Sequence, residues 1–305
     1  GNNIDVPEGE VVYTGMFNDR GTYETDLTIV RLAEQSFYLI TSTAQVVRDF
    51  DWISRHIRED EQADLTDVTT VYSVLGVMGP EAPALLGSVC DSDFSQAVFP
   101  FGTSREIEIG PITVGAIRIT YVGESGWELH IPAEQAVSVY DTLMESGRDF
   151  GLTNAGHYAI NCMRLEKGYR AWGADISPDD TPFEAGLSFA IDWNKDSIGR
   201  TALLERKQSA LIKRLAIFVL QDPDAVLWGN EPILRNGIPV GYTTSGAYGY
   251  TLRAAVGMGY IKHPDGIDTP FIQNGHYEIE TNGQRIPASI TLYPPYDPIR
   301  KRILT

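Results

Sequence analysis

The sequence predicts an α+β protein whose last hundred residues form a small antiparallel barrel or sandwich. In the first two thirds, strand-like and helix-like segments alternate without the regular spacing of a doubly wound sheet. After about residue 210 the segments become short and strand-like. Asn-Gly or Asp-Gly pairs, which supply the positive-φ residues of tight hairpins, recur there at 236–237, 265–266, 274–275 and 282–283. We therefore expect four hairpin turns in this last part.

The first block, 1–67, is expected to be a partial α+β subdomain. Residues 11–17 and 26–32 read as strands, and the turn signal Asn-Asp-Arg-Gly at 18–21 lies between them. A third strand is expected over 36–42. A helix follows, because apolar residues recur along one helical face at Val46, Phe50, Ile53 and Ile57.

The second block, 68–209, is expected to be an α+β domain, and the third, 210–305, the C-terminal β domain. In the second block Pro80 opens a short helix, where its missing N–H costs little. The turn at 123–126 has the length of a hairpin connection. The other elements expected in this block are strands at 71–77, 112–121 and 127–131 and helices at 133–148 and 154–165.

Composition excludes several classes of function. Asp and Glu number 41 against 24 Lys and Arg, a formal charge of −17, and no basic stripe is visible, so nucleic acid is not expected as a partner. No apolar run reaches the ~18 residues that cross a bilayer, so we expect a cytoplasmic or organelle-matrix protein. The spacing of Cys90, Cys162 and the five histidines suggests neither a disulfide framework nor a metal site. A dinucleotide-binding glycine motif and a hydrolase serine elbow are also absent from the sequence.

Three charged residues each have more than one reading. Asp26, after the first turn, is either a turn-capping carboxylate or a carboxylate aimed into a cleft to manage a proton or a developing cation. Strand alternation puts Glu128 and His130 on one face, which is either solvent-exposed or a site where a heterocycle edge with two N–H donors satisfies the carboxylate. Arg164, in an apolar helical setting, forms a buried ion pair, binds a ligand carboxylate, or fixes Glu128 or another acid.

Aromatic and acidic residues follow this helix. Tyr169 and Trp172 either fill a core or stack on a ligand. Asp179 and Asp180 lie between two prolines, which is typical of a rigid surface loop.

Several motifs are specific enough to compare with known families. They are Tyr-Thr-Gly-Met-Phe-Asn at 13–18, Asp-Leu-Thr-Ile-Val at 26–30, Gly-Glu-Ser-Gly-Trp-Glu-Leu at 123–129, Met-Arg-Leu-Glu-Lys-Gly at 163–168, Arg-Ala-Trp-Gly-Ala-Asp at 170–175 and the segment 179–190. Taken together, they resemble the folate-binding aminomethyltransferase family, whose best-known member is the T-protein of the glycine cleavage system. Within it, the chain looks like the C-terminal tetrahydrofolate-binding half of dimethylglycine oxidase, dimethylglycine dehydrogenase and sarcosine dehydrogenase. The resemblance covers nearly the whole chain and implies that family's fold of antiparallel sheets with packed helices, followed by an antiparallel β-barrel.

The resemblance implies roles for individual residues. Asp26 matches the catalytic aspartate beside the N5 and N10 nitrogens of tetrahydrofolate, and Glu128 matches the carboxylate that binds the amino edge of the pterin. Arg164 matches an arginine near the ligand. The aromatic residues expected around the folate are Tyr13, Tyr121, Tyr169, Trp172 and Tyr248.

The implied function is one-carbon transfer: an iminium or formaldehyde unit from N-methylglycine oxidation is captured as methylenetetrahydrofolate. Family members carry a further segment before the strand that holds Tyr13, and only 12 residues precede it here. We therefore expect the chain to be part of a larger flavoprotein, with FAD in a domain outside this chain, and to lie in the mitochondrial matrix if eukaryotic. The alternatives are a stand-alone aminomethyltransferase or folate-dependent demethylase, and a non-catalytic folate-binding module.

Overall fold

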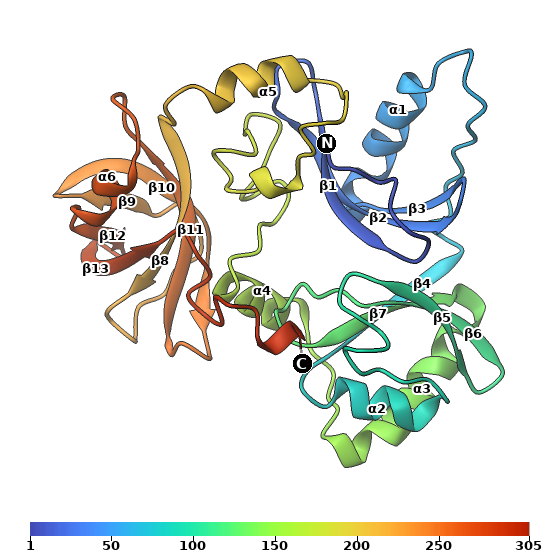
Figure 1. Ribbon diagram of the computed structural model, residues 1–305. Coiled ribbons are helices and arrows are strands. Elements are labelled where there is room, and N and C mark those ends of the chain that lie inside the picture. Colours follow the sequence, from blue (N-terminus) through green and yellow to red (C-terminus); the bar gives the residue numbers. More distant parts are fainter. Residues whose placement is uncertain (305) are drawn as a thin grey trace. The chain divides into compact units, whose positions relative to one another are not determined.

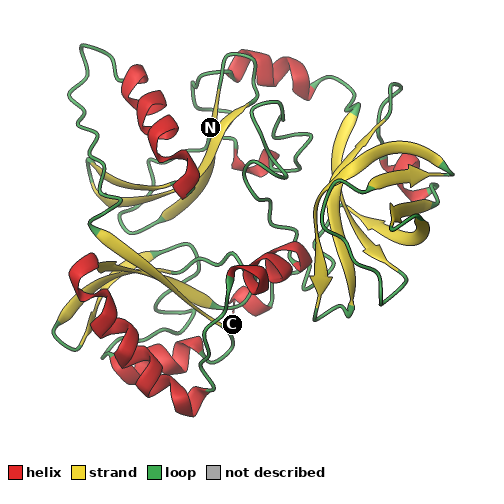
Figure 2. Ribbon diagram, turned by 180° about the vertical axis from the view of Figure 1, so that it is seen from behind, coloured by secondary structure: helices red, strands yellow, loops and turns green. Residues whose placement is uncertain are grey.

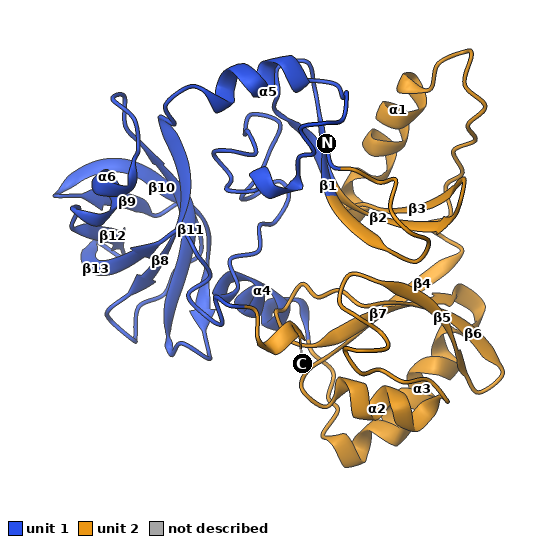
Figure 3. Cartoon of the chain, in the orientation of Figure 1, with its two compact units in different colours: residues 1–2, 14–26, 156–299 blue, residues 3–13, 27–155, 300–305 orange. Residues whose placement is uncertain are grey.

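A computed structural model describes residues 1–304 of the chain (Figure 1). It divides into two compact units, each made of segments that are distant in sequence (Figure 3). Unit 1 comprises residues 1–2, 14–26 and 156–299, and unit 2 comprises residues 3–13, 27–155 and those from 300 onward. The three domains expected from the sequence, 1–67, 68–209 and 210–305, divide the chain in a different way from these two units, and they stay a prediction.

The N-terminal sheet has three strands in the order β1-β2-β3, and the chain passes between the units within β1 and β2. The turn before β2 is closed by Asn18, whose backbone and side chain both bond to Thr22 at 3.0 and 2.9 Å. Helix α1 (Val46–His56) follows this sheet. The strands are β1 (Val11–Phe17), β2 (Tyr23–Ala33) and β3 (Ser36–Ile40).

Unit 2 contains an antiparallel sheet in the order β4-β7-β6-β5, with helices α2 and α3 packed on β7. Every second residue of β7 enters its core: Trp127, Leu129 and Ile131 are all fully buried. The strand predicted at 112–121 corresponds to β6, but it is shorter than expected. It ends at Ile117, and the next backbone N–H, that of Arg118, bonds to Thr103 outside the sheet. The elements are β4 (Tyr72–Met78), α2 (Ala82–Val89), β5 (Ser104–Ile109), β6 (Ile112–Ile117), β7 (Gly126–Pro132) and α3 (Ala136–Ser146).

Unit 1 contains a closed six-stranded antiparallel barrel in the order β10-β11-β8-β13-β12-β9 (Figure 2). Its interior is apolar, and Phe218, Ile233, Ile261 and Ile279 are fully buried. Helices α4 (His157–Glu166) and α5 (Arg200–Lys207) precede it, and α4 packs on β10 and β11. The strands are β8 (Lys213–Leu220), β9 (Pro232–Arg235), β10 (Ile238–Gly249), β11 (Ala254–Lys262), β12 (Tyr277–Thr281) and β13 (Gln284–Thr291).

The α+β class and the C-terminal barrel are confirmed, but the expectation of four hairpins is wrong. The pairs at 236–237 and 282–283 join β9 to β10 and β12 to β13. Those at 265–266 and 274–275 instead flank helix α6 (Thr269–Gln273), which Asp268 caps by accepting from the Phe271 N–H at 2.7 Å. Gly266 has a positive φ of 100°, as Gly237 and Gly283 have in the two hairpins, whereas Gly275 does not, so the dipeptide alone does not specify a hairpin. Over the described residues, no helix has the length and apolar composition needed to cross a bilayer.

Candidate functional site

Asp26 lies on the partly exposed face of β2, next to Thr25, which faces the core. Tyr23 begins the same strand and is almost fully buried. Burial raises the pKa of the Tyr23 hydroxyl, and the negative charge of Asp26 raises it further. The Asp26 carboxylate is therefore close enough to act electrostatically on this buried phenol.

Tyr23 also links the Asp26 strand to a loop that carries a predicted ligand contact. Its ring lies 6.3 Å from that of Trp172 in an edge-to-face arrangement and 5.1 Å from that of Phe17. Its backbone N–H bonds to the carbonyl of Asp180 at 3.1 Å. Trp172 is thus held beside the strand of Asp26 within unit 1.

Asp180 is not on a surface loop, which corrects the expectation from the sequence. It is buried and forms an ion pair with Lys213, while Asp179 is exposed as expected. A buried carboxylate needs a cationic partner, and this one is 33 positions away in the chain. Proline spacing alone gave no signal of that partner.

Arg164 is buried in α4, and each of its three guanidinium nitrogens donates a hydrogen bond within unit 1. Its Nε donates to Asn161 at 2.9 Å, and its Nη1 donates to Asp175 at 2.5 Å and to the carbonyl of Tyr169 at 3.1 Å. Its Nη2 donates to Ser245 on β10 at 2.7 Å. Of the readings weighed above, the structure shows the buried ion pair; a role near folate stays a prediction.

The partner of Arg164, Asp175, ties the loop that contains Tyr169 and Trp172 to the barrel. Its carboxylate accepts from the Ala171 N–H at 2.9 Å and from Thr244 on β10 at 2.5 Å. Its carbonyl accepts from the Tyr260 hydroxyl on β11 at 2.9 Å, and burial together with nearby carboxylates raises the pKa of Tyr260. Sequence analysis named Asp175 only as the end of the motif at 170–175 and did not predict these contacts.

Tyr248 lies half-buried on β10, the strand against which α4 packs. Its ring is 5.2 Å from that of the exposed Tyr250 in an edge-to-face contact. The structure thus places five of the predicted residues in unit 1: Asp26, Arg164, Tyr169, Trp172 and Tyr248.

Unit 2 carries Glu128 at the middle of β7. Its neighbours Trp127 and Leu129 point into the core, so Glu128 and His130 share the opposite face, as alternation predicted. The face is not simply solvent-exposed, because the side chains of Glu128 and His130 are 25% and 5% exposed. Across the ladder, Glu128 is paired with Gly76 of β4, which presents no side chain to this face.

A rigid core behind β7 fixes the position of Glu128. The ring of Trp127 packs edge-on against Phe94 and Phe99 at 5.0 and 5.8 Å, and the guanidinium of Arg118 lies 4.8 Å from its centroid. Arg118 is fully buried, which lowers its pKa, and it donates to the carbonyl of Phe99 at 2.6 Å. Sequence analysis did not single out Arg118.

The remaining predicted residues, Tyr13 and Tyr121, also belong to unit 2. Tyr121 is partly exposed and precedes a turn in which the N–H groups of Val122 and Gly123 donate to Thr120 at 3.2 and 3.1 Å. Tyr13 lies half-buried in β1. Their roles as folate contacts stay predictions.

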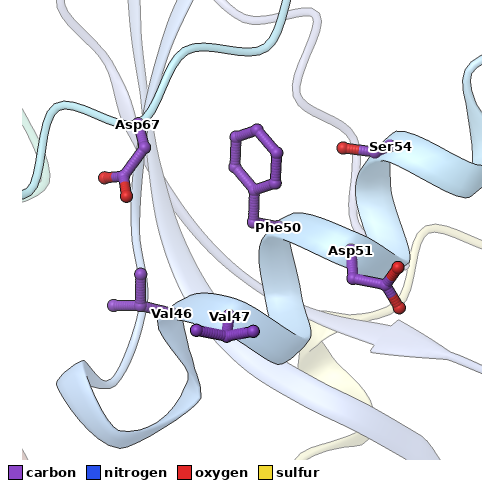
Figure 4. A pocket seen from close by; sticks show the side chains of 6 residues that line it. All are labelled: Val46, Val47, Phe50, Asp51, Ser54 and Asp67. Atoms are coloured by element: carbon purple, nitrogen blue, oxygen red, sulfur yellow. The ribbon is translucent and has the colours of Figure 1, made fainter.

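A separate cavity of about 510 Å³ lies in unit 2 at helix α1 and is lined by none of the predicted residues (Figure 4). It is open, and Val47 and Phe50 on its wall are exposed. Within residues 1–304, His, Cys, Asp and Glu side chains form no group of three or more that could hold a metal ion.

Comparison with family profiles identifies both parts of the chain. Residues 1–195 match the profile described as GCVT N-terminal domain, and residues 213–297 match the glycine cleavage T-protein C-terminal barrel domain. The chain is 24% identical to the glycine cleavage system aminomethyltransferase T of Bartonella henselae, with a TM-score of 0.81 over 96% of this chain and 78% of that one. The predicted fold is therefore confirmed.

Three curated relatives are similar over most of this chain. The mitochondrial pyruvate dehydrogenase phosphatase regulatory subunit of Mus musculus is 39% identical, covering 96% of this chain and 35% of the relative. The mitochondrial sarcosine dehydrogenase of Mus musculus is 35% identical over 98% of this chain and 34% of its own length. An aminomethyltransferase of Halothermothrix orenii is 32% identical over 85% of this chain and 71% of its own length. The chain thus spans about a third of the first two relatives.

Proposed function

Because the chain belongs to the glycine cleavage T-protein family, whose aminomethyltransferases bind tetrahydrofolate, we propose that it binds a reduced folate and transfers a one-carbon unit to it. The unit is an iminium or formaldehyde carbon released when an N-methylated glycine is oxidised. The sarcosine dehydrogenase relative supports this choice of donor. In the formaldehyde case the products are methylenetetrahydrofolate and water.

The observation that carries the proposal is the setting of Glu128. Its carboxylate stands half-buried on a strand whose other face is locked into a core. Its ladder partner on β4 is Gly76, and its partner on β6 is the buried Ile117. A carboxylate held in this way accepts two parallel N–H donors, which is what the amino edge of a pterin presents. Glu128 would therefore bind the ring and set its orientation.

Asp26 is the proposed catalytic residue. Bound tetrahydrofolate would supply the nitrogen nucleophiles for the transferred carbon. The Asp26 carboxylate would take up or orient the proton at that nitrogen and stabilise a cationic iminium donor electrostatically. Burial and, after it, the charge of Asp26 raise the pKa of the Tyr23 hydroxyl, so the carboxylate lies close enough to a neighbouring group to act on it electrostatically.

Oxidation of the methylated amine would take place in a flavin-containing domain or subunit outside this chain. This proposal is consistent with a chain that spans about a third of its sarcosine dehydrogenase relative. Two of the relatives described above are mitochondrial proteins, so the matrix is the proposed compartment for a eukaryotic source.

A non-catalytic folate-binding module is the second candidate, and one comparison favours it. The relative that is 39% identical is a regulatory subunit rather than an enzyme by name. A stand-alone aminomethyltransferase or demethylase is the third candidate. Absorbance and intact mass of the natively purified protein separate these: a yellow species much heavier than this chain indicates the flavoprotein, and a colourless one of the mass of this chain indicates a free-standing module.

Calorimetric titration with tetrahydrofolate tests the proposal. Glu128→Gln should weaken binding about 30-fold or more, for a loss of ~2 kcal/mol in charge-assisted hydrogen bonds. The matched control is Glu134→Gln at an exposed position shortly after β7. Asp26→Asn should still bind but lose methylenetetrahydrofolate formation above the uncatalysed rate. An unmodified protein that does not bind reduced folate would refute the folate proposal, and unchanged turnover in Asp26→Asn would refute the catalytic role.

A further inference from the structure

A row of three polar side chains crosses one face of unit 2: Tyr38 on β3, and His130 and Glu128 on β7. The Tyr38 hydroxyl and His130 Nδ1 are 3.1 Å apart, within hydrogen-bond distance. The other ring nitrogen, Nε2, lies 3.9 Å from Oε2 of Glu128. It is buried and has no hydrogen-bond partner among residues 1–304.

The chemistry of the row decides where the imidazole proton lies. A neutral imidazole donates from one nitrogen and accepts at the other. Burial, the neighbouring Tyr72 and the charge of Glu128 all raise the pKa of Tyr38, so its hydroxyl stays protonated and is able to donate. The opposite tautomer would aim the Nε2 lone pair at a carboxylate, which is repulsive. Tyr38 therefore donates to Nδ1, and Nε2 carries the proton that faces Glu128.

The packing around His130 keeps this orientation. Tyr38 stands edge-on to the imidazole, with ring centroids 5.3 Å apart and planes at 85°, and Tyr72 packs edge-on to Tyr38 at 6.0 Å. His130 itself is paired in the ladder with Val74 on one side and Gly115 on the other. The side chain that has room to move is Glu128, which is partly exposed, rather than His130.

We propose that His130, held by Tyr38, is the positioning residue for Glu128. This inference rests on the proposed function and adds to it. When a ligand edge with two N–H donors approaches, the carboxylate closes the 3.9 Å gap and accepts the Nε2–H on the second lone pair of Oε2. Both carboxylate oxygens then face the ligand in a fixed plane. The expected ligand class is a heterocycle with a 2-amino group beside a ring N–H, such as a reduced pterin.

Matched amide variants test the role of each nitrogen. In His130→Gln the side-chain amide nitrogen reaches the position of Nε2, whereas in His130→Asn it reaches only that of Nδ1. We expect His130→Asn to weaken tetrahydrofolate binding about tenfold and His130→Gln to stay within about threefold of the unmodified protein. Tyr38→Phe should fall between them, and the control Tyr72→Phe should bind normally.

Selectivity separates positioning from simple structural damage. A folate analogue without the 2-amino group makes only one of the two hydrogen bonds to Glu128, so His130→Asn should weaken its binding much less than that of tetrahydrofolate. Equal weakening of both ligands, or unchanged tetrahydrofolate affinity in His130→Asn, would overturn the proposal.

A ligand-free measurement keeps the inference distinct from the proposed function. Nitrogen-15 NMR of labelled histidine should show the Nε2–H tautomer of His130 in the unmodified protein, and a shift of its Nε2 signal in Glu128→Gln. Observation of the Nδ1–H tautomer would refute the inference even if folate binds. Failure of tetrahydrofolate to bind, with the expected tautomer present, would instead refute the proposed function and leave the His130–Glu128 pairing established.

Discussion

Replacing Asp175 by Asn removes the charge from the buried network that ties α4 to the barrel while keeping the shape of the side chain. In the native protein the Asp175 carboxylate accepts three hydrogen bonds, from Arg164 at 2.5 Å, Thr244 at 2.5 Å and the Ala171 N–H at 2.9 Å. The side chains of Arg164 and Asp175 are 3% and 0% exposed. Water therefore cannot solvate Arg164 once its partner is neutral.

The expected loss follows from that burial. Removing one member of a buried ion pair costs about 3–5 kcal/mol, because the remaining charge is left desolvated and unpaired. The asparagine side chain has only one oxygen to accept from the three donors. Its NH₂ group is itself a donor, so it cannot accept from the donor that it faces. Since Ser245 and the Tyr169 carbonyl continue to accept from Arg164, we expect a loss near the lower end, about 3 kcal/mol of unfolding free energy.

Urea unfolding followed by circular dichroism and tryptophan fluorescence measures this loss. The control is Asp51→Asn, which removes the same charge from the exposed helical pair Arg55–Asp51, with side chains 62% and 61% exposed. That change should cost no more than about 0.5 kcal/mol. A loss below about 1 kcal/mol for Asp175→Asn would show that the network does not hold a desolvated charge, and the reasoning would fail.

Three further predictions concern the backbone, the pH dependence and a helix cap. Gly241→Ala should lower the unfolding free energy by about 3 kcal/mol, because the new Cβ would lie 1.9 Å from the carbonyl oxygen of Tyr260. In the control Gly237→Ala the Cβ meets nothing within 4 Å, so only the left-handed backbone costs stability, about 1–2 kcal/mol. Thermal denaturation that shows Gly237→Ala to be the more damaging change would contradict this. Because folding raises the pKa of Tyr23 above its ordinary value of 10.0, the contribution of Tyr23 to stability is full below pH 10 and declines as pH rises from there toward the raised pKa. Tyr23→Phe should therefore flatten the decline in unfolding free energy above about pH 10, and an unchanged slope would count against this reasoning. Asp268→Ala should lower unfolding free energy by about 1 kcal/mol through loss of its cap, and an unaltered urea midpoint would exclude that role.

Patterns with a short period were predictable from the sequence. Strand alternation placed Glu128 and His130 on one face, and the structure has them there, 3.9 Å apart. The helix expected from Val46 onward is α1, because one apolar stripe at a period of 3.6 residues is a local property of the chain. The α+β class and the C-terminal barrel were also predicted from local patterns in the sequence.

Pairings between distant residues were not predictable in this way. Arg164 bonds to Ser245, 81 positions later, and Lys213 neutralises Asp180, which proline spacing suggested was on the surface. Such partners are fixed by the packing of α4 and the loops on the barrel, which no local period encodes. The resemblance to a family suggested which residues matter, but the contacts that hold them had to come from the structure.

The division of the chain has a consequence for synthesis on the ribosome. The sheet of unit 2 lies within residues 72–132, so its strands are available for pairing soon after they emerge. Unit 1 instead joins residues 14–26 to residues 156–299, so the segment that contains Asp26 must wait for the second half of the chain before its own core exists. During that interval the exposed apolar residues of β1 and β2 are a target for chaperones, and a truncation after residue 155 would leave the Asp26 segment permanently without its packing partners.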